Sequence, residues 1–385
     1  MDGTRIAMAM IIAISIYGGL NYYIGLRIFQ WLRLLFPKLS GALFTTVLLL
    51  CALSVVLGMA LPGDMGAAAY AVDVFGSYWM GIFAYLLFYF ILTDLVVSVG
   101  RIVKAVPSPV PRGVRFFSGM TAIALAAGTV SFGLYNAHQV RHVSYDVPAA
   151  AATSSAGLNI VLISDLHLGA VQSETRLERV VETVNRLKPD LVCIAGDIFN
   201  DDFHAIRDPD RAAELLRSIR AGYGVYASLG NHDGGHTIDR MLEFLERSNI
   251  RLLKDEYAVV DDRLVLVGRL DPSPIGGYGG LQRKPLADII GSLNTDLPVV
   301  VLDHTPSNLD DYGENINLVL SGHTHKGQIF PANLVTNALF EVDYGLYRRD
   351  ASSPYVVVTS GAGTWGMPMR VGSNNEVVLI RFHSG

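Results

Sequence analysis

The sequence predicts an α/β domain built on a parallel sheet, preceded by a domain of four membrane-spanning helices. Before residue 150, four apolar runs come close to the ~20 residues that a spanning helix needs. After residue 157, short β-rich runs alternate with helical patterns, which is typical of a parallel sheet. A chain with 51% hydrophobic and only 17% charged residues agrees with a partly membrane-embedded protein.

The transmembrane domain is expected to cover residues 1–146, with helices at about 6–26, 41–61, 78–99 and 116–137. The first run lacks a small-x-small cleavage pattern and has only Arg5 before it, so it is interpreted as a retained helix. Basic residues occur between the first and second and between the third and fourth runs, but not between the second and third. The positive-inside rule therefore predicts that the C-terminal domain lies outside the cytoplasm.

The small residues of 147–157 predict a linker, and residues 158–385 a single folded domain. Helices are expected across 174–187 and 209–220. Fewer helices separate the later strands, which favours a second, mixed sheet packed on the first. The expected strands are 159–163, 191–195, 224–229, 257–260, 264–268, 299–302, 318–320, 355–359 and 376–381.

Charge is distributed unevenly along the chain. The first 150 residues contain nine Lys and Arg against five Asp and Glu, and the remainder contains 21 against 30. The acidic C-terminal part argues against a nucleic-acid partner, because binding a nucleic-acid backbone requires clustered basic residues. With two cysteines, Cys51 and Cys193, both in apolar runs, the sequence predicts no disulfide framework.

Five short motifs follow apolar runs of the C-terminal part, where parallel sheets place their functional groups. They are Asp165-Leu-His167, Gly196-Asp197, Gly230-Asn231-His232-Asp233, His304 and Gly322-His323-Thr-His325. Carboxylates combined with imidazoles suit divalent Mn, Fe or Zn, and the ligands are too numerous for one ion. Two ions roughly 3.5–4 Å apart would bridge a hydroxide that attacks a phosphoryl group, so the motifs predict phosphoester hydrolysis.

The order of these motifs resembles the calcineurin-like metallophosphoesterase superfamily across residues 158–385. The segments Ser321–Gln328 and Ser360–Gly366 are similar to late motifs of its bacterial membrane-anchored subfamily. The resemblance implies a four-layer α/β/β/α sandwich with metals at the strand ends. It also implies a bridging Asp197, a first metal bound by Asp165, His167 and His325, and a second bound by Asn231, His304 and His323.

The resemblance further implies that His232 is catalytic, either stabilising the transition state or protonating the leaving oxygen. Asp233 could orient that imidazole or stabilise the turn. Lys326 stands where the family usually has glycine and could contact a second phosphate or be a surface lysine. Arg370 could bind substrate phosphate through its guanidinium fork or form a structural salt bridge.

These observations predict a metal-dependent phosphodiesterase or pyrophosphatase in a bacterial inner or cell membrane, with an extracytoplasmic site. A site beside a membrane favours a lipid-linked phosphate, and the apolar segment 329–340 could form a lip that meets the bilayer or could pack under the second sheet. One alternative is hydrolysis of a soluble nucleotide or phosphomonoester. The other is a non-catalytic sensor or regulatory domain on a membrane helix bundle.

Overall fold

The computed structural model describes residues 3–149, 157–171, 173–291, 293, 295–307 and 309–384. Contacts divide the chain into two compact units. The first comprises Met1–Leu61 and Ala67–Gly133, and the second comprises Pro62–Gly66 and Leu134–Gly385. The two units are therefore described separately.

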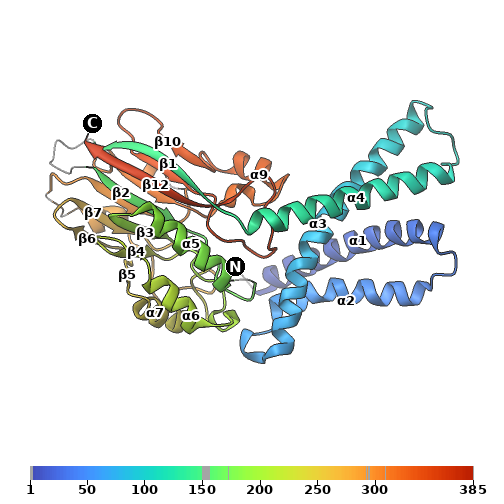
Figure 1. Ribbon diagram of the computed structural model, residues 1–385, viewed down its shortest axis with the longest axis horizontal. Coiled ribbons are helices and arrows are strands. Elements are labelled where there is room, and N and C mark those ends of the chain that lie inside the picture. Colours follow the sequence, from blue (N-terminus) through green and yellow to red (C-terminus); the bar gives the residue numbers. More distant parts are fainter. Residues whose placement is uncertain are drawn as a thin grey trace. The chain divides into compact units, whose positions relative to one another are not determined.

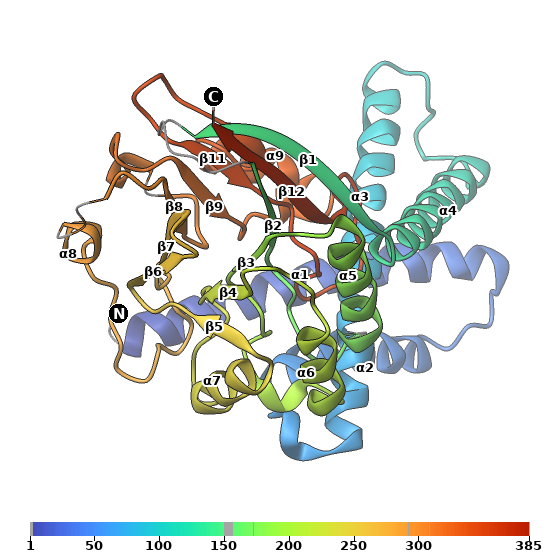
Figure 2. The same cartoon turned by 60° about the vertical axis from the view of Figure 1, so that its left-hand side comes forward.

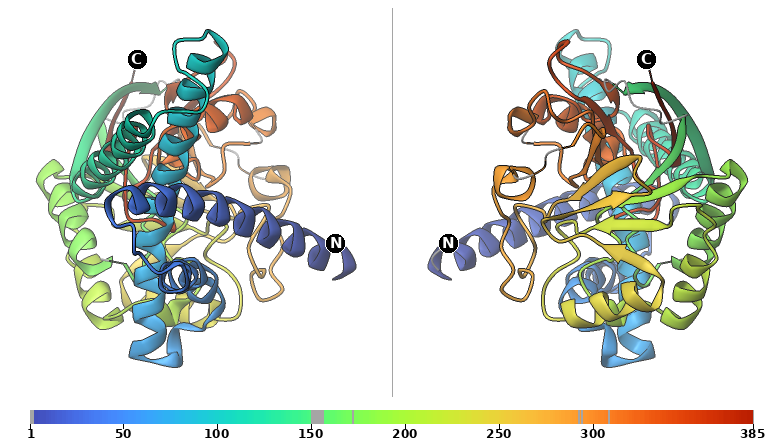
Figure 3. Two further views of the ribbon diagram at one scale, coloured as in Figure 1. Left: turned by 90° about the vertical axis from the view of Figure 1, so that its right-hand side faces the viewer. Right: turned by 90° about the vertical axis from the view of Figure 1, so that its left-hand side faces the viewer.

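The first unit consists of long helices, coloured blue to teal in Figure 3. All four are long and apolar enough to cross a membrane, which is the expected number. Large apolar side chains remain exposed along them, as in helices that face lipid. The helices are α1 (Gly3–Leu35), α2 (Gly41–Ala60), α3 (Ala67–Ile102) and α4 (Arg112–Ala137), of which the last four residues belong to the second unit.

The second unit is built on two six-stranded sheets, seen in Figures 1 and 2. The first sheet has the order β1 (Val140–Ala149), β12 (Asn375–Ser384), β2 (Leu158–Ile163), β3 (Leu191–Ala195), β4 (Val225–Ser228) and β5 (Ile250–Leu252). The second has the order β10 (Gly345–Tyr347), β11 (Tyr355–Val358), β9 (Leu318–Ser321), β8 (Val299–Leu302), β7 (Leu264–Gly268) and β6 (Glu256–Val260).

Three apolar clusters define the layers of this unit. Ile160 and Leu162 of the first sheet share one buried cluster with Leu266 and Val300 of the second, so the sheets pack face to face. The outer face of the first sheet packs on α5 (Ser173–Leu187), α6 (Pro209–Arg217) and α7 (Ile238–Arg247), and that of the second on the short α8 (Leu286–Ile290). The expected α/β/β/α sandwich, preceded by four apolar helices, is confirmed.

The folded domain begins earlier than the expected residue 158. Strand β1 runs parallel to β12 over its whole length, with Val147 beside Phe382. The expected end of the transmembrane domain at 146 and start of the linker at 147 are therefore wrong. Within β1, only Val147 and Ala149, at its end, are buried in the core. The rest of the strand therefore shows little of the alternation of apolar and polar residues by which a strand is recognised in a sequence. Residues 150–156 of the expected linker lie outside the described residues.

The short connection between α2 and α3 belongs to the second unit. The backbone N–H of Gly63 donates a hydrogen bond to Asp202 Oδ2 over 2.8 Å. A Cβ on Gly63 would lie 2.5 Å from the backbone nitrogen of Ala205, so only glycine fits against this segment. The connection is thus packed on the domain that holds the five motifs.

Candidate metal and catalytic site

The predicted metal ligands lie just beyond the carboxyl ends of neighbouring strands in both sheets. Asp165 and His167 follow β2, Asp197 follows β3, and Asn231 follows β4. From the second sheet, His304 follows β8, and both histidines of the G-H-x-H motif follow β9. Since the sheets pack face to face, all seven side chains meet at one end of the sandwich.

Five of the seven ligand residues adopt a left-handed backbone conformation. Their φ angles are 52° at Asp165, 44° at His167, 51° at Asp197, 71° at His323 and 50° at His325. Non-glycine residues rarely adopt this conformation, and such residues concentrate at functional sites. The strand ends therefore turn sharply to aim these side chains inward.

Two motif glycines leave room for the ligand carboxylates. A Cβ on Gly230 would lie 2.3 Å from Asp197 Oδ1, and a Cβ on Gly322 would lie 2.3 Å from Asp165 Oδ2. Any side chain at either position would displace a carboxylate. Glycine is thus required here by the close approach of the ligand groups.

The ligand atoms form two groups. Asp165, His167 and His325 have ligand atoms within 4.8 Å of one another, and so do Asp197, His304 and His323. Asp197 Oδ2 lies 3.1 Å from His304 Nε2 and 3.7 Å from His167 Nε2, so it stands between the groups. The structure thus brings together the residues expected to bind each metal, with the expected bridging carboxylate between them.

The Asn231 side chain lies next to the second group, which contains Asp197, His304 and His323. Its Oδ1 lies 2.8 Å from Nδ1 of His323. An amide oxygen at this point offers one more neutral ligand without adding charge.

The donor set fits two divalent cations. Nε2 of His304 is fully buried and makes no well-formed hydrogen bond, although buried polar atoms are normally satisfied. The Nε2 atoms of His167 and His325 point at each other over 3.0 Å. A cation bound by these nitrogens would satisfy them, and mixed carboxylate and imidazole ligands suit first-row divalent metals.

Three of the four histidines in the two groups are in the protonation state that favours metal binding. Burial lowers the pKa of His167, His325 and His323, the last to about 4, which leaves these imidazoles neutral. His304 differs, because burial lowers its pKa but the adjacent Asp197 carboxylate raises it well above the usual value. A metal at this position would have to displace that proton.

The catalytic candidate, His232, lies beside the metal groups rather than in them. Its ring centroid is 5.2 Å from that of His167, and its backbone N–H donates to Asp197 Oδ1 over 2.9 Å. Nδ1 lies 2.7 Å from Asp201 Oδ1. Burial lowers the pKa of His232, but the Asp201 bond and the Asp197 charge outweigh burial and raise it.

Asp201 was missed by the sequence analysis. It follows Gly196-Asp197 by a few residues in Asn200-Asp201-Asp202, and nothing local distinguishes it from its neighbour. Its positive φ of 64° is visible only in the folded chain. The signal that could have singled it out is its place in the loop after β3, at the same sheet edge as His232.

Asp233 stabilises the turn, one of the two roles considered for it. Its carboxylate accepts hydrogen bonds from the backbone N–H groups of Phe199 and Gly230, each over 2.8 Å. Burial and the neighbouring Asp197 raise its pKa to about 7. Asp201, not Asp233, contacts the imidazole of His232.

Arg370 is fully buried behind His325. Its guanidinium donates to the backbone oxygen of His325 over 3.0 Å, to Asn375 Oδ1 over 2.8 Å and to the backbone oxygen of Gly363 over 2.6 Å. Burial lowers its pKa to about 10, which still leaves it charged at neutral pH. These contacts suit a residue that positions His325. They occupy all three guanidinium nitrogens, which leaves little capacity to bind phosphate.

We expect Arg370→Met to weaken metal binding about 10- to 100-fold, the usual effect of removing a residue that orients a ligand. Metal retained per chain after dialysis against graded chelator would measure this effect. Arg269→Met is the matched control, because Arg269 is equally buried but pairs with Asp255. Equal metal retention in the Arg370 variant and the unmodified protein would contradict the positioning role.

Lys326, the residue in place of the usual glycine, is half-buried against an aromatic ring. Its Nζ lies 4.0 Å from the ring centroid of Tyr344, a cation–π distance. Tyr344 in turn donates to Glu376 Oε2 over 3.0 Å. Lysine adopts the left-handed φ of 49° that glycine would provide, so the contact with Tyr344 accompanies a strained backbone.

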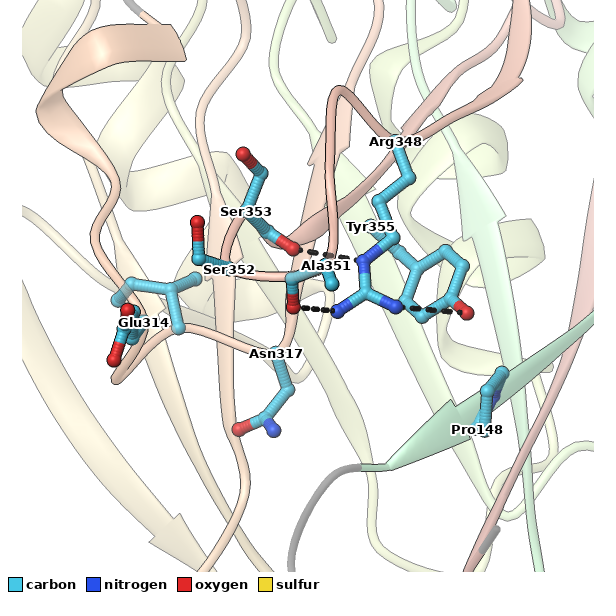
Figure 4. Close-up of a pocket in the computed structure, with 9 residues that line it drawn as sticks. Pro148, Glu314, Asn317, Arg348, Ala351, Ser352, Ser353 and Tyr355 are labelled. Atoms are coloured by element: carbon cyan, nitrogen blue, oxygen red, sulfur yellow. Dashed lines mark hydrogen bonds between the residues drawn. The ribbon is translucent and has the colours of Figure 1, made fainter.

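A separate cavity of about 320 Å³ lies at the opposite ends of the strands, where β9 and β11 begin (Figure 4). Arg348 lines this cavity. Its guanidinium already donates to the backbone oxygens of Ser353 and Ala351 and lies over the ring of Tyr355. This cavity contains none of the predicted site residues.

The chain matches the family model for calcineurin-like phosphoesterases over residues 158–327. It is 31% identical over 320 residues to a Danio rerio protein described as a transmembrane protein with metallophosphoesterase domain, covering 78% of this chain and 71% of that one. The protein belongs to the calcineurin-like phosphoesterase family. It is also 30% identical over 242 residues to an uncharacterized metallophosphoesterase of Aquifex aeolicus, covering 63% and 91%.

These similarities extend the family assignment beyond bacteria. A Bos taurus protein, also described as a transmembrane protein with metallophosphoesterase domain, is 32% identical over 277 residues, covering 67% of this chain and 61% of that one. Two animal relatives are thus described as transmembrane proteins with a metallophosphoesterase domain. The two His and Asp groups are consistent with the metal dependence that the family name states.

Proposed function

We propose that this family member is a membrane-anchored, two-metal phosphoesterase that hydrolyses a phosphodiester or pyrophosphate bond in a lipid-linked substrate outside the cytoplasm. The observation that carries the proposal is the pair of metal-binding groups on either side of Asp197, with His232 beside them. A sensor domain would not need a buried histidine held by a carboxylate next to two complete ligand sets.

The chemistry divides between the bound cations and the protein. Two divalent cations would lower the pKa of a water and neutralise phosphoryl oxygens. Asp197 holds the two ligand groups together, and its Oδ1 also fixes the backbone of His232. With Nδ1 engaged by Asp201, Nε2 of His232 can give a proton to the leaving oxygen. The raised pKa of His232 favours the protonated form that this step requires.

Two observations support an extracytoplasmic site. If all four candidate spans cross a membrane, their even number leaves both ends of the helical region on the same side of it. The connection at Pro62–Gly66 has no basic residue, and it is grouped with the phosphoesterase domain. By contrast, the connections between α1 and α2 and between α3 and α4 contain Lys38 and Lys104.

A labelling experiment tests the side of the membrane. Cysteine would be placed singly at Glu246, Asp64 and Lys38, in a Cys51→Ser background that retains the buried Cys193. We expect a membrane-impermeant maleimide to label the first two positions in intact cells and the third only after lysis. Labelling of Lys38→Cys alone in intact cells would place the domain in the cytoplasm and overturn this part of the proposal.

A turnover experiment tests the reaction and the substrate class. Detergent-purified protein with added Mn²⁺ would be given bis-p-nitrophenyl phosphate or a mixed phospholipid extract, with His232→Ala in parallel. We expect hydrolysis of both substrates, faster for lipid; in the variant, lipid hydrolysis should be lost and hydrolysis of bis-p-nitrophenyl phosphate should fall much less, because its leaving oxygen departs without a proton. Equal turnover of soluble and lipid phosphodiesters would favour a soluble substrate, and no turnover with two metals bound would favour a regulatory domain.

A further inference from the structure

An exposed apolar surface follows the last metal-binding motif. Residues 329–340 contain no charged side chain. The structure folds most of them into helix α9 (Ala332–Leu339), which has no buried residue. Five large apolar side chains form what we call the apolar ridge. They are Phe330, Leu334, Val335 and Leu339, which are 41%, 61%, 57% and 73% exposed, and Trp365, which is 50% exposed.

The apolar ridge adjoins the candidate site. The ring centroid of Trp365 lies 5.7 Å from that of His232. Phe340, at the end of α9, has its ring 5.8 Å from that of His323. Gln328 ties the two parts of the ridge together, because its side chain accepts from the backbone N–H of Trp365 over 2.8 Å and donates to the backbone oxygen of the same residue.

The apolar ridge is also tied to the point where the chain leaves the last candidate span. Asn136, at the end of α4, donates to the backbone oxygen of Ser373 over 2.9 Å. Ser373 Oγ donates to the backbone oxygen of Gln328 over 2.8 Å, and the N–H of Phe330 donates to the backbone oxygen of Val371 over 2.7 Å. All of these residues belong to the second unit. The loop around 371–373 thus joins the end of α4 to the start of the ridge.

We propose that the apolar ridge inserts into the interfacial layer of the bilayer that α4 enters, and so holds the catalytic site at the level of lipid phosphates. Interfacial helices bury an apolar face of Leu, Phe and Trp in the headgroup region, and the exposed Leu, Phe and Trp side chains of the ridge are residues of this kind. A soluble surface rarely exposes so many large apolar side chains close together. Insertion of the ridge does not depend on the proposed function. Only its consequence, delivery of a lipid-linked substrate to the site, rests on that proposal.

A depth measurement tests the insertion without reference to catalysis. In the Cys51→Ser background, Leu334→Cys and Leu339→Cys would be labelled with the fluorophore NBD in the full chain, reconstituted singly into phospholipid nanodiscs. We expect acyl-chain spin-labelled lipids to quench both probes at least about twofold more than a probe at Val259→Cys. Val259 is the matched control because it is 46% exposed and lies on β6, the opposite edge of the second sheet from β10.

A kinetic measurement tests whether the ridge delivers lipid substrate to the site. The triple variant Leu334→Ser, Val335→Ser and Leu339→Ser changes only exposed side chains and spares Trp365, which contacts His232. We expect turnover of a long-chain phospholipid in nanodiscs to fall about tenfold or more, since apolar burial drives interfacial binding. Turnover of bis-p-nitrophenyl phosphate should remain unchanged.

The outcomes separate this inference from the proposed function. Quenching of both ridge probes without hydrolysis of any substrate would support the insertion and overturn the phosphoesterase proposal. Absence of quenching, or equal quenching at Val259→Cys, would overturn the insertion whatever the activity. A second preparation with two copies per disc tests self-association: a blue shift of NBD emission that appears only there, without quenching by spin-labelled lipids, would indicate self-association and also overturn the insertion.

Discussion

Replacing Asp197 with alanine is expected to lower kcat/KM for bis-p-nitrophenyl phosphate by roughly 10³-fold or more, the loss expected when metal-based charge stabilisation of several kcal/mol disappears. The reason is its position between the groups. Oδ2 is the only carboxylate oxygen, among the residues that the structure describes in the two groups, that approaches both His304 and His167, at 3.1 and 3.7 Å. Metal content by elemental analysis should fall together with activity.

Asp271→Asn provides the matched control for the Asp197 variant. Asp271 is also buried, but its oxygens accept hydrogen bonds from Thr305 and from the backbone of Ser273. This variant should retain both metals and most of the activity. If Asp197→Ala also kept two metals and near-normal turnover, the two-group description of the site would be wrong.

His232→Gln is expected to slow hydrolysis by about 10²- to 10⁴-fold for substrates with an alkoxide leaving group, which is the range for loss of a general acid. The loss should be much smaller for p-nitrophenyl substrates, because their leaving oxygen departs without a proton. Metal content should not change, since His232 belongs to neither metal-binding group. Comparison of a methyl and a p-nitrophenyl phosphodiester gives the measurement.

The Asp201→Asn variant tests which group keeps His232 in its protonated, acid form. The Asp201 bond is the first contribution that raises the pKa of His232 against burial, so its removal should lower that pKa. The acid form exists below the pKa and is lost as pH rises through it. The descending limb of the kcat/KM profile should therefore move to lower pH. If activity fell but the descending limb stayed at the same pH, a group other than His232 would determine the position of that limb.

The order of the motifs determined which residues form the site. Each ligand follows an apolar strand, and parallel strands bring their carboxyl ends to one edge, so proximity of Asp165, Asp197 and Asn231 follows from local pattern alone. Local hydropathy also predicted the number of long apolar helices found among the described residues. Both properties depend on periodicity and run length, which are written in neighbouring residues.

Contacts between distant segments were decided by tertiary structure. Arg370 was expected either to bind phosphate or to form a structural salt bridge, but folding of the loop before β12 buries it against His325, 45 residues earlier. Lys326 was expected either at phosphate or on the surface, and it packs on Tyr344. Such contacts depend on how loops cross at the sheet edge, and local sequence does not encode that crossing.

By itself, the sequence determined the family, the two-sheet fold, the four apolar helices and the candidate metal-binding residues that the fold brings together. Each of these depends on patterns that a single strand, helix or turn imposes on its own residues. Only the tertiary structure decided that Asp201 rather than Asp233 holds His232, that β1 extends the first sheet, and that α9 exposes an apolar face. These depend on long-range packing, where the same local pattern is compatible with several partners.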